Sequence, residues 1–419
     1  KKMKKKILII FLVFMTIGSY FSIDFIKDAR KNRTWPFNSS IGLYLPQWVK
    51  FYAYKYTNPN EKEIITQYYK IKLDYVTIPA KSSVGGGGAI NLLKNDNYLL
   101  TLNNGDNFIF NLKNKEFYKQ NLNFKGYTGI RDILINSNKD KVLVLGIKKE
   151  REDCKSISLD EYNITNISET FNFENQNTIW KSEELCNNPM ENNGGGRILE
   201  YKGGYLISTG FFAQNKNSGI YKYPQDINSS FGKIIRIYKN DKKFSSEIYS
   251  YGHRNPQGLI FSKRNNKIIS SEHGPQGGDE INIINKNGNY GWPCKTWGAR
   301  YDYDFKINSK IWPKNLEDYG CKNNSKFIEP LFSWSPSVAI SQGIEYTGEE
   351  FSQFNNNILF GSLKAASIFR LYVSNEMRVI NYEKIFINER IRDIISSNKG
   401  QIILYTDGGN LVILKRIKS

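Results

Sequence analysis

The chain has 419 residues and a formal net charge of +19, from 59 Lys and Arg against 40 Asp and Glu. Its 40 % hydrophobic and 24 % charged residues exclude a disordered or fibrous chain. Only two histidines are present, His253 and His273, which excludes a histidine-rich metal site. The basic residues are scattered among Asn and Ile and form no long block, so we expect no nucleic-acid partner.

The N-terminal segment has the pattern of an export signal. Lysines crowd residues 1–6, an apolar run follows over Ile7–Gly18, and weaker apolar character continues to Ile26. No small-residue cleavage site stands out, so residues 1–26 are expected to be a signal peptide or an uncleaved anchor, with residues 7–26 as an inner-membrane tether. Either one places the rest of the chain in the periplasm or elsewhere outside the cytoplasm.

Residues 27–75 are expected to form a connector, which Pro36 and Pro46 interrupt and in which Glu61–Lys72 is a candidate short helix. From about this point onward, helical periodicity is scarce. Short runs rich in β-branched and aromatic residues alternate with turns of Asn, Gly and Lys. This alternation predicts an all-β domain over residues 76–419.

One pattern recurs along this domain: a short apolar strand, a polar turn, and a second strand that ends in small or polar residues. The six copies are residues 88–106, 129–146, 196–210, 257–274, 342–363 and 390–409. They predict a six-bladed β-propeller in which each copy supplies two inner strands of a four-stranded blade; a pair of irregular β-sandwiches is the disfavoured alternative. The loops after the second strands are expected to share one face, where ligands bind.

The four cysteines are Cys154, Cys186, Cys294 and Cys321, and no two of them form a C-x-x-C motif, which disfavours a zinc site. In an exported protein an even number permits two disulfides, with three possible pairings. Proximity in sequence favours Cys154–Cys186 and Cys294–Cys321, and four buried thiols are the alternative.

Three stretches go beyond a generic propeller pattern: GHRNPQGL (252–259), EHGPQGGDEIN (272–282) and GNYGWP (288–293). Together with ERIRD (389–393) and two further segments, SPSVAISQGIEY and NNILFGSLK, they resemble the soluble pyrroloquinoline-quinone (PQQ) sugar dehydrogenases, the glucose/sorbosone dehydrogenase-like family that includes aldose sugar dehydrogenases. The resemblance implies a six-bladed propeller that holds PQQ flat on its top face beside a calcium ion. It also implies oxidation of an aldose at its anomeric carbon to a lactone, with electrons passing to an external acceptor.

The resemblance assigns cofactor-binding residues by position. Arg254 and Asn255 would contact the quinone and its reactive oxygen, and Lys364, Arg390 and Arg392 would bind the cofactor's carboxylates. Physical chemistry agrees, because three carboxylates need several fixed cations and the paired donors of Arg fit a carboxylate. Two residues apart on a strand, the last two arginines share one face. Each of these residues taken alone has an ordinary structural explanation; their joint appearance favours the site.

The calcium ligands implied by the resemblance are the backbone carbonyls of Gly274 and Pro275. Calcium prefers hard oxygen ligands, and a Gly-Pro turn can expose carbonyls to it. We expect His253 and His273 to serve as structural hydrogen-bonding groups.

The pattern departs from the family at the group that should accept the sugar's hydroxyl proton. In the family this is a His four residues before the Arg of a G-G-R run; the run here is Gly195–Ile198, and the matching position is Asn193. An amide does not accept a proton usefully near neutral pH. The family also tends to have an acidic residue where this chain has Phe211.

Three explanations stay open: a shifted alignment, another base, or loss of sugar oxidation. Glu191, Glu200 and Asp226 are the alternative bases, with Asp226 preferred, so the candidate catalytic residues are Asn193, Arg254 and Asp226. Two other functions also remain. One is a non-catalytic binding or scaffold propeller. The other is a calcium-dependent lactonase-like hydrolase, which needs a side-chain cluster around its metal that the acidic residues at 279 and 280 do not complete.

Overall fold

The protein is described here by a computed structural model. It describes residues 62–80, 86–120, 122, 124–165, 172–187, 190, 194–212, 220–241, 243–298, 320–321 and 325–417. The expected signal or anchor segment, residues 1–26, lies outside this set. Among the described residues, no helix has the length and apolar character needed to cross a membrane.

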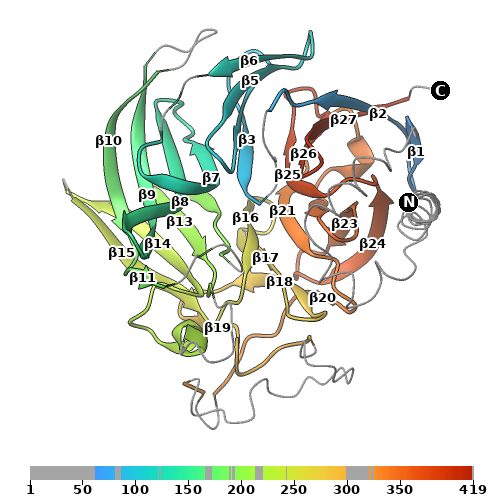
Figure 1. Cartoon of the computed structure of the whole chain (residues 1–419). Coiled ribbons are helices and arrows are strands. Elements are labelled where there is room, and N and C mark those ends of the chain that lie inside the picture. Colours follow the sequence, from blue (N-terminus) through green and yellow to red (C-terminus); the bar gives the residue numbers. More distant parts are fainter. Residues whose placement is uncertain are drawn as a thin grey trace, which may run out of the picture. The chain divides into compact units, whose positions relative to one another are not determined.

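Six sheets, antiparallel except for the parallel pair of β15 and β19, form the blades of a β-propeller (Figure 1), which confirms the predicted fold. Blades I to III follow the chain from its N-terminal side. Their strands are β3 (Gly88–Leu92), β4 (Asn97–Leu102), β5 (Asn107–Asn111) and β6 (Glu116–Gln120) in blade I; β7 (Tyr127–Ile135), β8 (Lys141–Arg151), β9 (Cys154–Thr165), β10 (Asn172–Lys181) and β11 (Leu185–Cys186) in blade II; and β12 (Ile198–Tyr201), β13 (Gly204–Thr209), β14 (Lys233–Asn240), β15 (Lys243–Tyr251) and β19 (Gly288–Asn289) in blade III.

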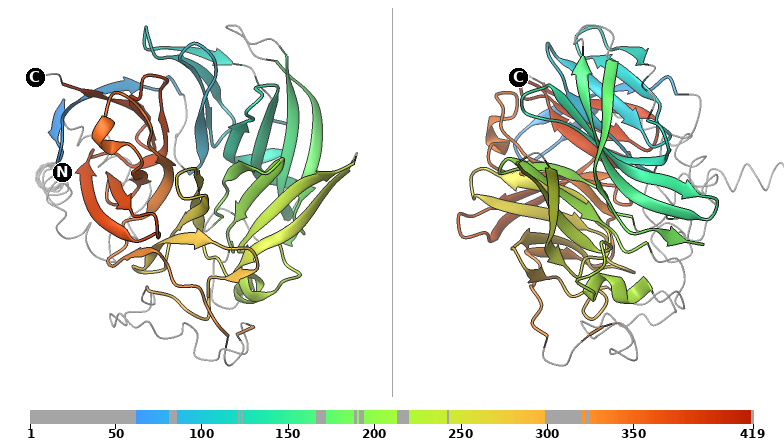
Figure 2. Two further views of the ribbon diagram at one scale, coloured as in Figure 1. Left: turned by 180° about the vertical axis from the view of Figure 1, so that it is seen from behind. Right: turned by 90° about the vertical axis from the view of Figure 1, so that its left-hand side faces the viewer.

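Blades IV to VI complete the ring, which Figure 2 shows from two further sides. Their strands are β16 (Pro256–Ser262), β17 (Lys267–Glu272), β18 (Asp279–Ile284) and β20 (Phe332–Trp334) in blade IV; β21 (Ile340–Glu345), β22 (Ile358–Ser362), β23 (Ser367–Val373) and β24 (Val379–Phe386) in blade V; and β25 (Ile391–Ser396), β26 (Ile402–Thr406), β27 (Asn410–Arg416), β2 (Lys70–Thr77) and β1 (Glu63–Ile65) in blade VI. Two short 3₁₀ helices are η1 (Ile220–Gln225) and η3 (Ser352–Phe354). The first two strands of each blade coincide with one of the six sequence repeats.

Blade VI is built from both ends of the described chain, because β2 pairs with β27 from Ile71 opposite Arg416 to Thr77 opposite Asn410. The sequence analysis predicts a short helix over Glu61–Lys72, and this prediction is wrong. Residues 70–73 alternate between exposed and buried, which is the period of a strand. Blade VI of the propeller therefore includes β1 and β2, which lie in the segment expected to be a connector.

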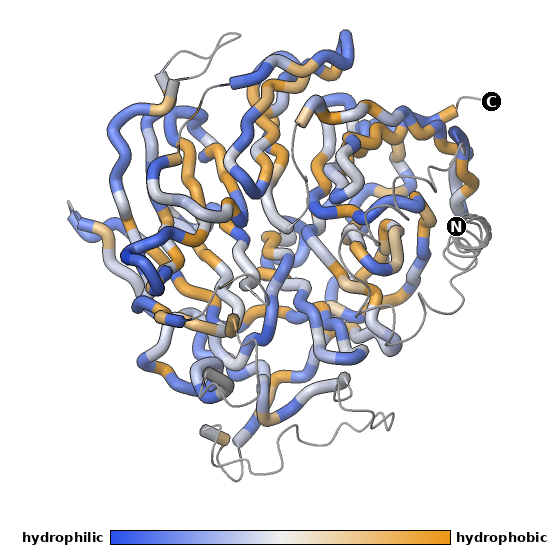
Figure 3. Tube along the Cα trace, in the orientation of Figure 1, coloured by the Kyte–Doolittle hydropathy of each residue, from blue (hydrophilic) through white to orange (hydrophobic). Residues whose placement is uncertain are grey.

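The hydrophobic core lies between neighbouring blades. In β4, Tyr98 packs with Tyr405 of blade VI, whereas Leu99 packs with Val142 and Val144 of blade II. Both faces of an inner strand are thus buried, and apolar residues follow the inner strands in Figure 3. This explains why those strands read as nearly continuous apolar runs.

Arg197 joins four blades at the centre of the ring. Its Nη1 lies 3.2 Å from Asp132 Oδ1, its Nε donates to the Gln257 carbonyl at 2.9 Å, and its Nη2 donates to the Arg392 carbonyl at 2.9 Å. Burial raises the pKa of Asp132 to about 7 although Arg197 opposes this. The backbones that carry the candidate site are therefore tied to one buried guanidinium group.

Two disulfides cross-link the chain, Cys154–Cys186 in blade II and Cys294–Cys321 after β19. These are the pairings that proximity in sequence favoured, so that prediction is confirmed.

Candidate functional site

Strand pairing brings two segments of blade IV to the same edge. β16 and β17 are antiparallel, and Pro256 lies opposite Glu272. Arg254 and Asn255, just before β16, therefore lie beside the residues that follow β17. The same rule applies in blade VI to the start of β25 and the end of β26.

Arg254 is buried, and its guanidinium group is directed at the turn after β17. Its Nη1 donates to the backbone carbonyls of His273 at 2.9 Å and Gly274 at 2.6 Å. Its backbone N–H donates to Glu272 Oε2 at 3.0 Å and fixes the start of β16. A buried cation in this position is screened less by water, which strengthens its attraction for an anion.

Two aromatic rings flank this guanidinium group. Its Cζ atom lies 5.6 Å from the centroid of the Phe211 ring and 5.2 Å from that of Trp292. The two rings meet edge to face, with centroids 5.3 Å apart. Cation–π contacts contribute about 0.5–2 kcal/mol each. Phe211, which stands where the resemblance leads us to expect an acidic residue, thus supports Arg254 with an apolar surface.

Side-chain hydrogen bonds connect His273, Asn255 and Gln257. His273 Nε2 lies 2.6 Å from the Ile340 carbonyl, which can only accept, so Nε2 carries the proton. Its Nδ1 then accepts from Asn255 Nδ2, 3.3 Å away. Asn255 Oδ1 in turn accepts from Gln257 Nε2 at 2.8 Å. The orientation of the Asn255 amide is therefore fixed on both sides.

The pKa of His273 depends on the charges around the imidazole. Burial lowers its pKa, Asp279 raises it, and the charges of Arg254 and Arg392 lower it further. The imidazole is therefore kept neutral between two arginines, and this agrees with a hydrogen-bonding role.

Arg392 and Arg390 share one carboxylate in blade VI. Arg392 donates from Nε and Nη2 to the two oxygens of Asp407 at 3.0 and 2.8 Å, and Arg390 Nε donates to Oδ2 at 3.3 Å. Burial raises the pKa of Asp407, but the two arginines outweigh it and hold the pKa below its usual value. Arg392 Nη1 also donates to Gln257 Oε1 at 3.2 Å, which links blade VI to blade IV.

Lys364 follows β22 in blade V and is half-buried. Burial lowers its pKa, and the charge of Asp279 opposes this. The Asp279 side chain accepts four hydrogen bonds, from Gly274 N, Ser337 Oγ, Val338 N and Ala339 N. Asp279 therefore binds the loops of blades IV and V. Because its oxygens accept these hydrogen bonds from the protein, a lactonase-type metal site at this residue is disfavoured.

Gly274 and Pro275 form a tight turn above blade IV. A Cβ atom on Gly274 would lie 2.3 Å from the carbonyl oxygens of Gly277 and Gly278, so only glycine fits. The turn therefore brings several backbone carbonyls close together next to Arg254.

The contacts above connect three of the four cationic residues grouped in the sequence, because hydrogen bonds through His273, Asn255, Gln257 and Asp407 link Arg254 to Arg392 and Arg390. Arg254 precedes β16, Lys364 follows β22, and Arg390 and Arg392 flank the start of β25, so they come from three consecutive blades. The charges of Arg254 and Arg392 lower the pKa of His273. The charge of Asp279 raises the pKa of both His273 and Lys364.

Of the candidate proton acceptors, the two that the structure describes, Asp226 and Glu200, make their hydrogen bonds away from this cluster. Asn193 and Glu191 lie outside the described residues. Asp226 lies in the turn after η1, where its Oδ1 accepts from the Asn228 N–H at 2.9 Å. Glu200 accepts two hydrogen bonds from Ser137 on an exposed surface. Within the described part of the chain, none of these hydrogen bonds reaches Arg254.

The sequence analysis missed three residues that shape the site. Gln257 and Trp292 lie inside the quoted motifs. The local sequence does not indicate that Gln257 hydrogen-bonds to blade VI or that Trp292 stacks on Arg254. Asp407 follows the second strand of the sixth repeat, and its position at a strand end was the available signal.

Residues 88–415 match the family described as glucose/sorbosone dehydrogenase. The chain belongs to this family. The match spans all six blades, so family membership agrees with the propeller topology and with the stretches that carry the resemblance.

Two glucose/sorbosone-type relatives illustrate the extent of the similarity. Aldose sugar dehydrogenase YliI of Escherichia coli is 32 % identical over 237 residues, 54 % of this chain and 60 % of the relative. Quinoprotein glucose dehydrogenase B of Acinetobacter calcoaceticus is 30 % identical over 244 residues, 45 % of this chain and 50 % of the relative. The chain thus spans 50–60 % of the length of these two relatives.

A solved structure supports the fold of this family member. The apo-form of the soluble aldose sugar dehydrogenase from Escherichia coli superposes with a TM-score of 0.65 and 21 % identity, covering 82 % of this chain and 99 % of the other. At this identity the likeness shows the propeller fold.

Proposed function

We propose that this protein is a PQQ-dependent oxidoreductase that oxidises an aldose at its anomeric carbon to a lactone and passes electrons to an external acceptor. The observation that carries the proposal is the hydrogen-bonded set of Arg254, Arg390 and Arg392, which joins blades IV and VI, and Lys364 follows β22 in the intervening blade V. The printed names of the relatives, an aldose sugar dehydrogenase and a quinoprotein glucose dehydrogenase, support the substrate class and the cofactor.

The donor set fits a ligand with three carboxylates. Arg392 uses three N–H groups on Asp407 and Gln257, and a guanidinium group has five. Arg390 keeps 30 % of its side chain exposed, and Lys364 is half-buried, so both are accessible to a bound anion. These residues would hold the cofactor's carboxylates, while Arg254 and Asn255 would contact the quinone.

The turn of Gly274 and Pro275 fits a hard cation. The Gly274 carbonyl accepts one hydrogen bond from Arg254 Nη1, and a carbonyl oxygen has two lone pairs, so one remains for a metal. These two backbone carbonyls would supply oxygen ligands of the kind that calcium prefers.

When bound, PQQ would accept a hydride from the sugar, and calcium would polarise the quinone. The protein's contribution is orientation and charge. Arg254 presents a fixed cation in a little-hydrated place, where it stabilises negative charge on a bound ligand without reorganising. Asn255 is held by His273 and Gln257 in a single amide orientation and so offers fixed polar groups.

The proton acceptor for the sugar hydroxyl is the open part of this mechanism. Asn193 stands at the position of the family's histidine, and we propose Asp226 as the substitute base. Loss of a general base typically costs about 10²–10⁴-fold in rate. If Asp226 is the base, Asp226→Asn should lower turnover by about 10²–10⁴-fold, measured by dye reduction with saturating PQQ, calcium and several aldoses, whereas a rise of about 100-fold or more in Asn193→His would show that no base is present. An unchanged rate in Asn193→His, with a lower rate in Asp226→Asn, would assign the base to Asp226.

The second candidate is a propeller that binds the quinone without oxidising sugar. Phe211 favours it, because a buried apolar ring rests on Arg254 where an acidic residue is expected. Titration of the metal-depleted protein with calcium and PQQ, followed by turnover assays, separates the candidates. Binding with turnover supports the dehydrogenase, binding without turnover in any aldose supports the binding propeller, and the absence of binding contradicts both.

We also propose that the protein acts outside the cytoplasm, in the periplasm or on the outer side of the inner membrane. The two disulfides support this location, because such bonds persist in oxidising compartments. Fractionation of cells that express the full chain, with quinone-dependent activity measured in each fraction, tests this location.

A further inference from the structure

We propose that residues 290–298, here called the strap, position Arg254 for cofactor binding, and that the Cys294–Cys321 disulfide fastens the strap. The proposal rests on the proposed function, because it concerns the same site. Trp292 and the two cysteines are positioning residues in this arrangement, since they act through Arg254. Four observations carry the proposal.

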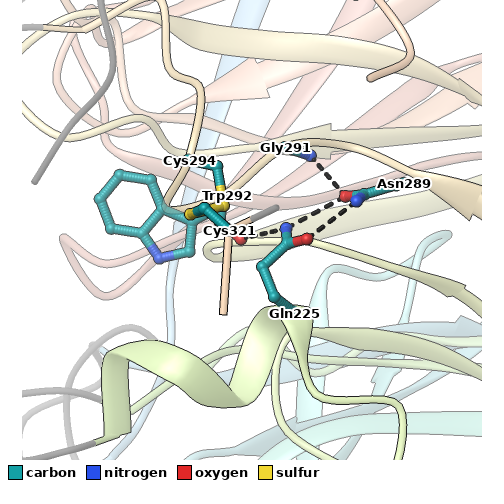
Figure 4. The surroundings of a disulfide bond; sticks show 6 residues. All are labelled: Gln225, Asn289, Gly291, Trp292, Cys294 and Cys321. Atoms are coloured by element: carbon teal, nitrogen blue, oxygen red, sulfur yellow. Dashed lines mark hydrogen bonds between the residues drawn. A yellow bond between two sulfur atoms is a disulfide. The ribbon is translucent and has the colours of Figure 1, made fainter. Parts of the chain in front are cut away.

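The first is the attachment of the strap before Trp292 (Figure 4). Gln225 Nε2 donates to Asn289 Oδ1 at 3.0 Å and to the Trp292 carbonyl at 2.7 Å, while Asn289 Nδ2 donates back to Gln225 Oε1 at 2.8 Å. The Trp292 N–H donates to the Gly252 carbonyl at 2.9 Å. Gly252 lies two residues before Arg254, so the strap is bonded to the backbone that carries the arginine.

The second observation is the attachment after Trp292. Cys294 and Cys321 are both buried and are joined by a disulfide (Figure 4). The bond lies two residues beyond the tryptophan. The backbone that carries Trp292 is therefore attached covalently through Cys294 and by hydrogen bonds to Gln225 and Gly252.

The third observation is the contact with the arginine. The centroid of the Trp292 ring lies 5.2 Å from Arg254 Cζ, and the Phe211 ring lies 5.6 Å from it. Residues 295 and 296 of the strap line the same narrow cavity as Arg254 and Gly274. The strap thus forms one wall of the space in which the guanidinium group lies.

The fourth observation is the close approach of the strap to the proposed calcium turn. A Cβ atom on Gly298 would lie 2.4 Å from the Gly277 carbonyl oxygen and 2.8 Å from Pro275 Cδ. A Cβ atom on Gly278 would lie 2.2 Å from the Gly298 nitrogen. Because the backbones are this close, a displaced strap would also displace the turn whose carbonyl accepts from Arg254.

The chain contains its own control. The Cys154–Cys186 disulfide closes a stretch of similar length, with a sequence separation of 32 against 27, but it joins β9 and β11 at blade II. Loss of either bond should release a similar amount of unfolded-chain entropy. The two double variants, C294S/C321S and C154S/C186S, should therefore differ in their effect on the site and not in their effect on stability.

The test compares both double variants of the full chain with the parent at a temperature where all are folded. For the parent and C154S/C186S we expect the same PQQ dissociation constant in the presence of calcium. For C294S/C321S we expect binding about tenfold weaker, the smaller end of the range for losing a residue that orients a ligand group. Equal affinities in all three proteins, or equal losses in both variants, would overturn the proposal.

A second readout needs no cofactor. The ring currents of Phe211 and Trp292 should shift the NMR signal of the Arg254 Nε–H, which the R254K variant assigns. We expect this shift to be retained in C154S/C186S and Trp292→Phe, and to be lost in C294S/C321S and Trp292→Leu. A retained shift in C294S/C321S would contradict the positioning of Arg254 by the strap, even if the parent binds no PQQ. A parent that binds no PQQ would contradict only the proposed function.

Discussion

Arg254 in blade IV and Arg392 in blade VI are both buried arginines at the proposed cofactor edge, but different groups hold them in place. Arg392 is held by both oxygens of Asp407, so a carboxylate compensates its charge. Arg254 is held by two backbone carbonyls and two aromatic rings. The two arginines therefore differ in their described contacts: an ion pair fixes Arg392, whereas backbone carbonyls and aromatic rings contact Arg254.

The difference also concerns what each arginine depends on. Arg392 lies on β25, and its partner Asp407 directly follows β26, so strand register fixes the pair. Arg254 depends on a turn, a strap and a distant phenylalanine. The blade VI corner should therefore be sensitive to the loss of a charge, and the blade IV corner to changes in its loops.

The largest expected effect is on the blade VI corner. Asp407→Asn leaves Arg392 buried without its carboxylate, and breaking a buried ion pair in this way costs about 3–5 kcal/mol. We expect the free energy of unfolding at pH 7, measured with urea, to fall by about this amount. Glu63→Gln, which removes an exposed pair with Lys70, is the control and should change it by less than about 1 kcal/mol. Similar values for the two variants would contradict the buried pair.

The same pair should give a pH dependence. Because the arginines hold the pKa of Asp407 below the ordinary aspartate value of 3.8, the contribution of Asp407 to stability is present above that pH and is lost on acidification. The difference in the free energy of unfolding between Asp407→Asn and the parent should therefore become smaller in strong acid.

The next largest effect is on the blade IV corner. Arg254→Met should weaken PQQ binding by about 100-fold, because removing a buried charged partner from a bound anion typically costs 2–5 kcal/mol. Its cost in stability should be smaller than that of Asp407→Asn, because methionine places no unpaired charge in the protein, whereas Asp407→Asn leaves the buried Arg392 without its carboxylate. Arg264→Met, in the turn between β16 and β17, removes an arginine that stacks on Tyr372 and should leave the affinity unchanged. Equal affinities for both variants would remove Arg254 from the site.

The pKa of His273 depends on the arginines of both corners. Since burial and the two arginines lower its pKa, the folded protein disfavours the imidazolium form. Stability from this group is present above the ordinary histidine pKa of 6.5 and is lost as the pH falls. We expect His273→Gln to lose less stability than the parent between pH 7 and pH 5 in thermal unfolding. Parallel pH curves for the two proteins would contradict the neutral imidazole.

The smallest expected effect tests the aromatic support. Phe211→Leu removes one cation–π contact, worth about 0.5–1 kcal/mol, and should weaken PQQ binding by about two- to fivefold. Phe211→Tyr keeps the ring and should bind like the parent. A stronger effect of Tyr than of Leu would show that shape rather than the ring matters at this position.

Local sequence was informative where local physics decides the outcome. The inner strands were recognisable because each is a short apolar run that ends in polar residues, and neighbouring blades bury both faces. Residues 61–72 were misread because a short segment of Lys and Ile fits a helix or a strand. Only its pairing with β27 decides between them.

By itself, the sequence determined the number of blades and favoured the disulfide pairs that form, because these follow from repeated patterns and short spacings. Tertiary structure alone decided how the ring closes and which group holds each arginine. Gln257 and Arg392 are 135 residues apart, and their contact exists only because blades IV and VI meet at the centre of the ring. Such partners depend on which blades face one another, and no local pattern encodes that arrangement.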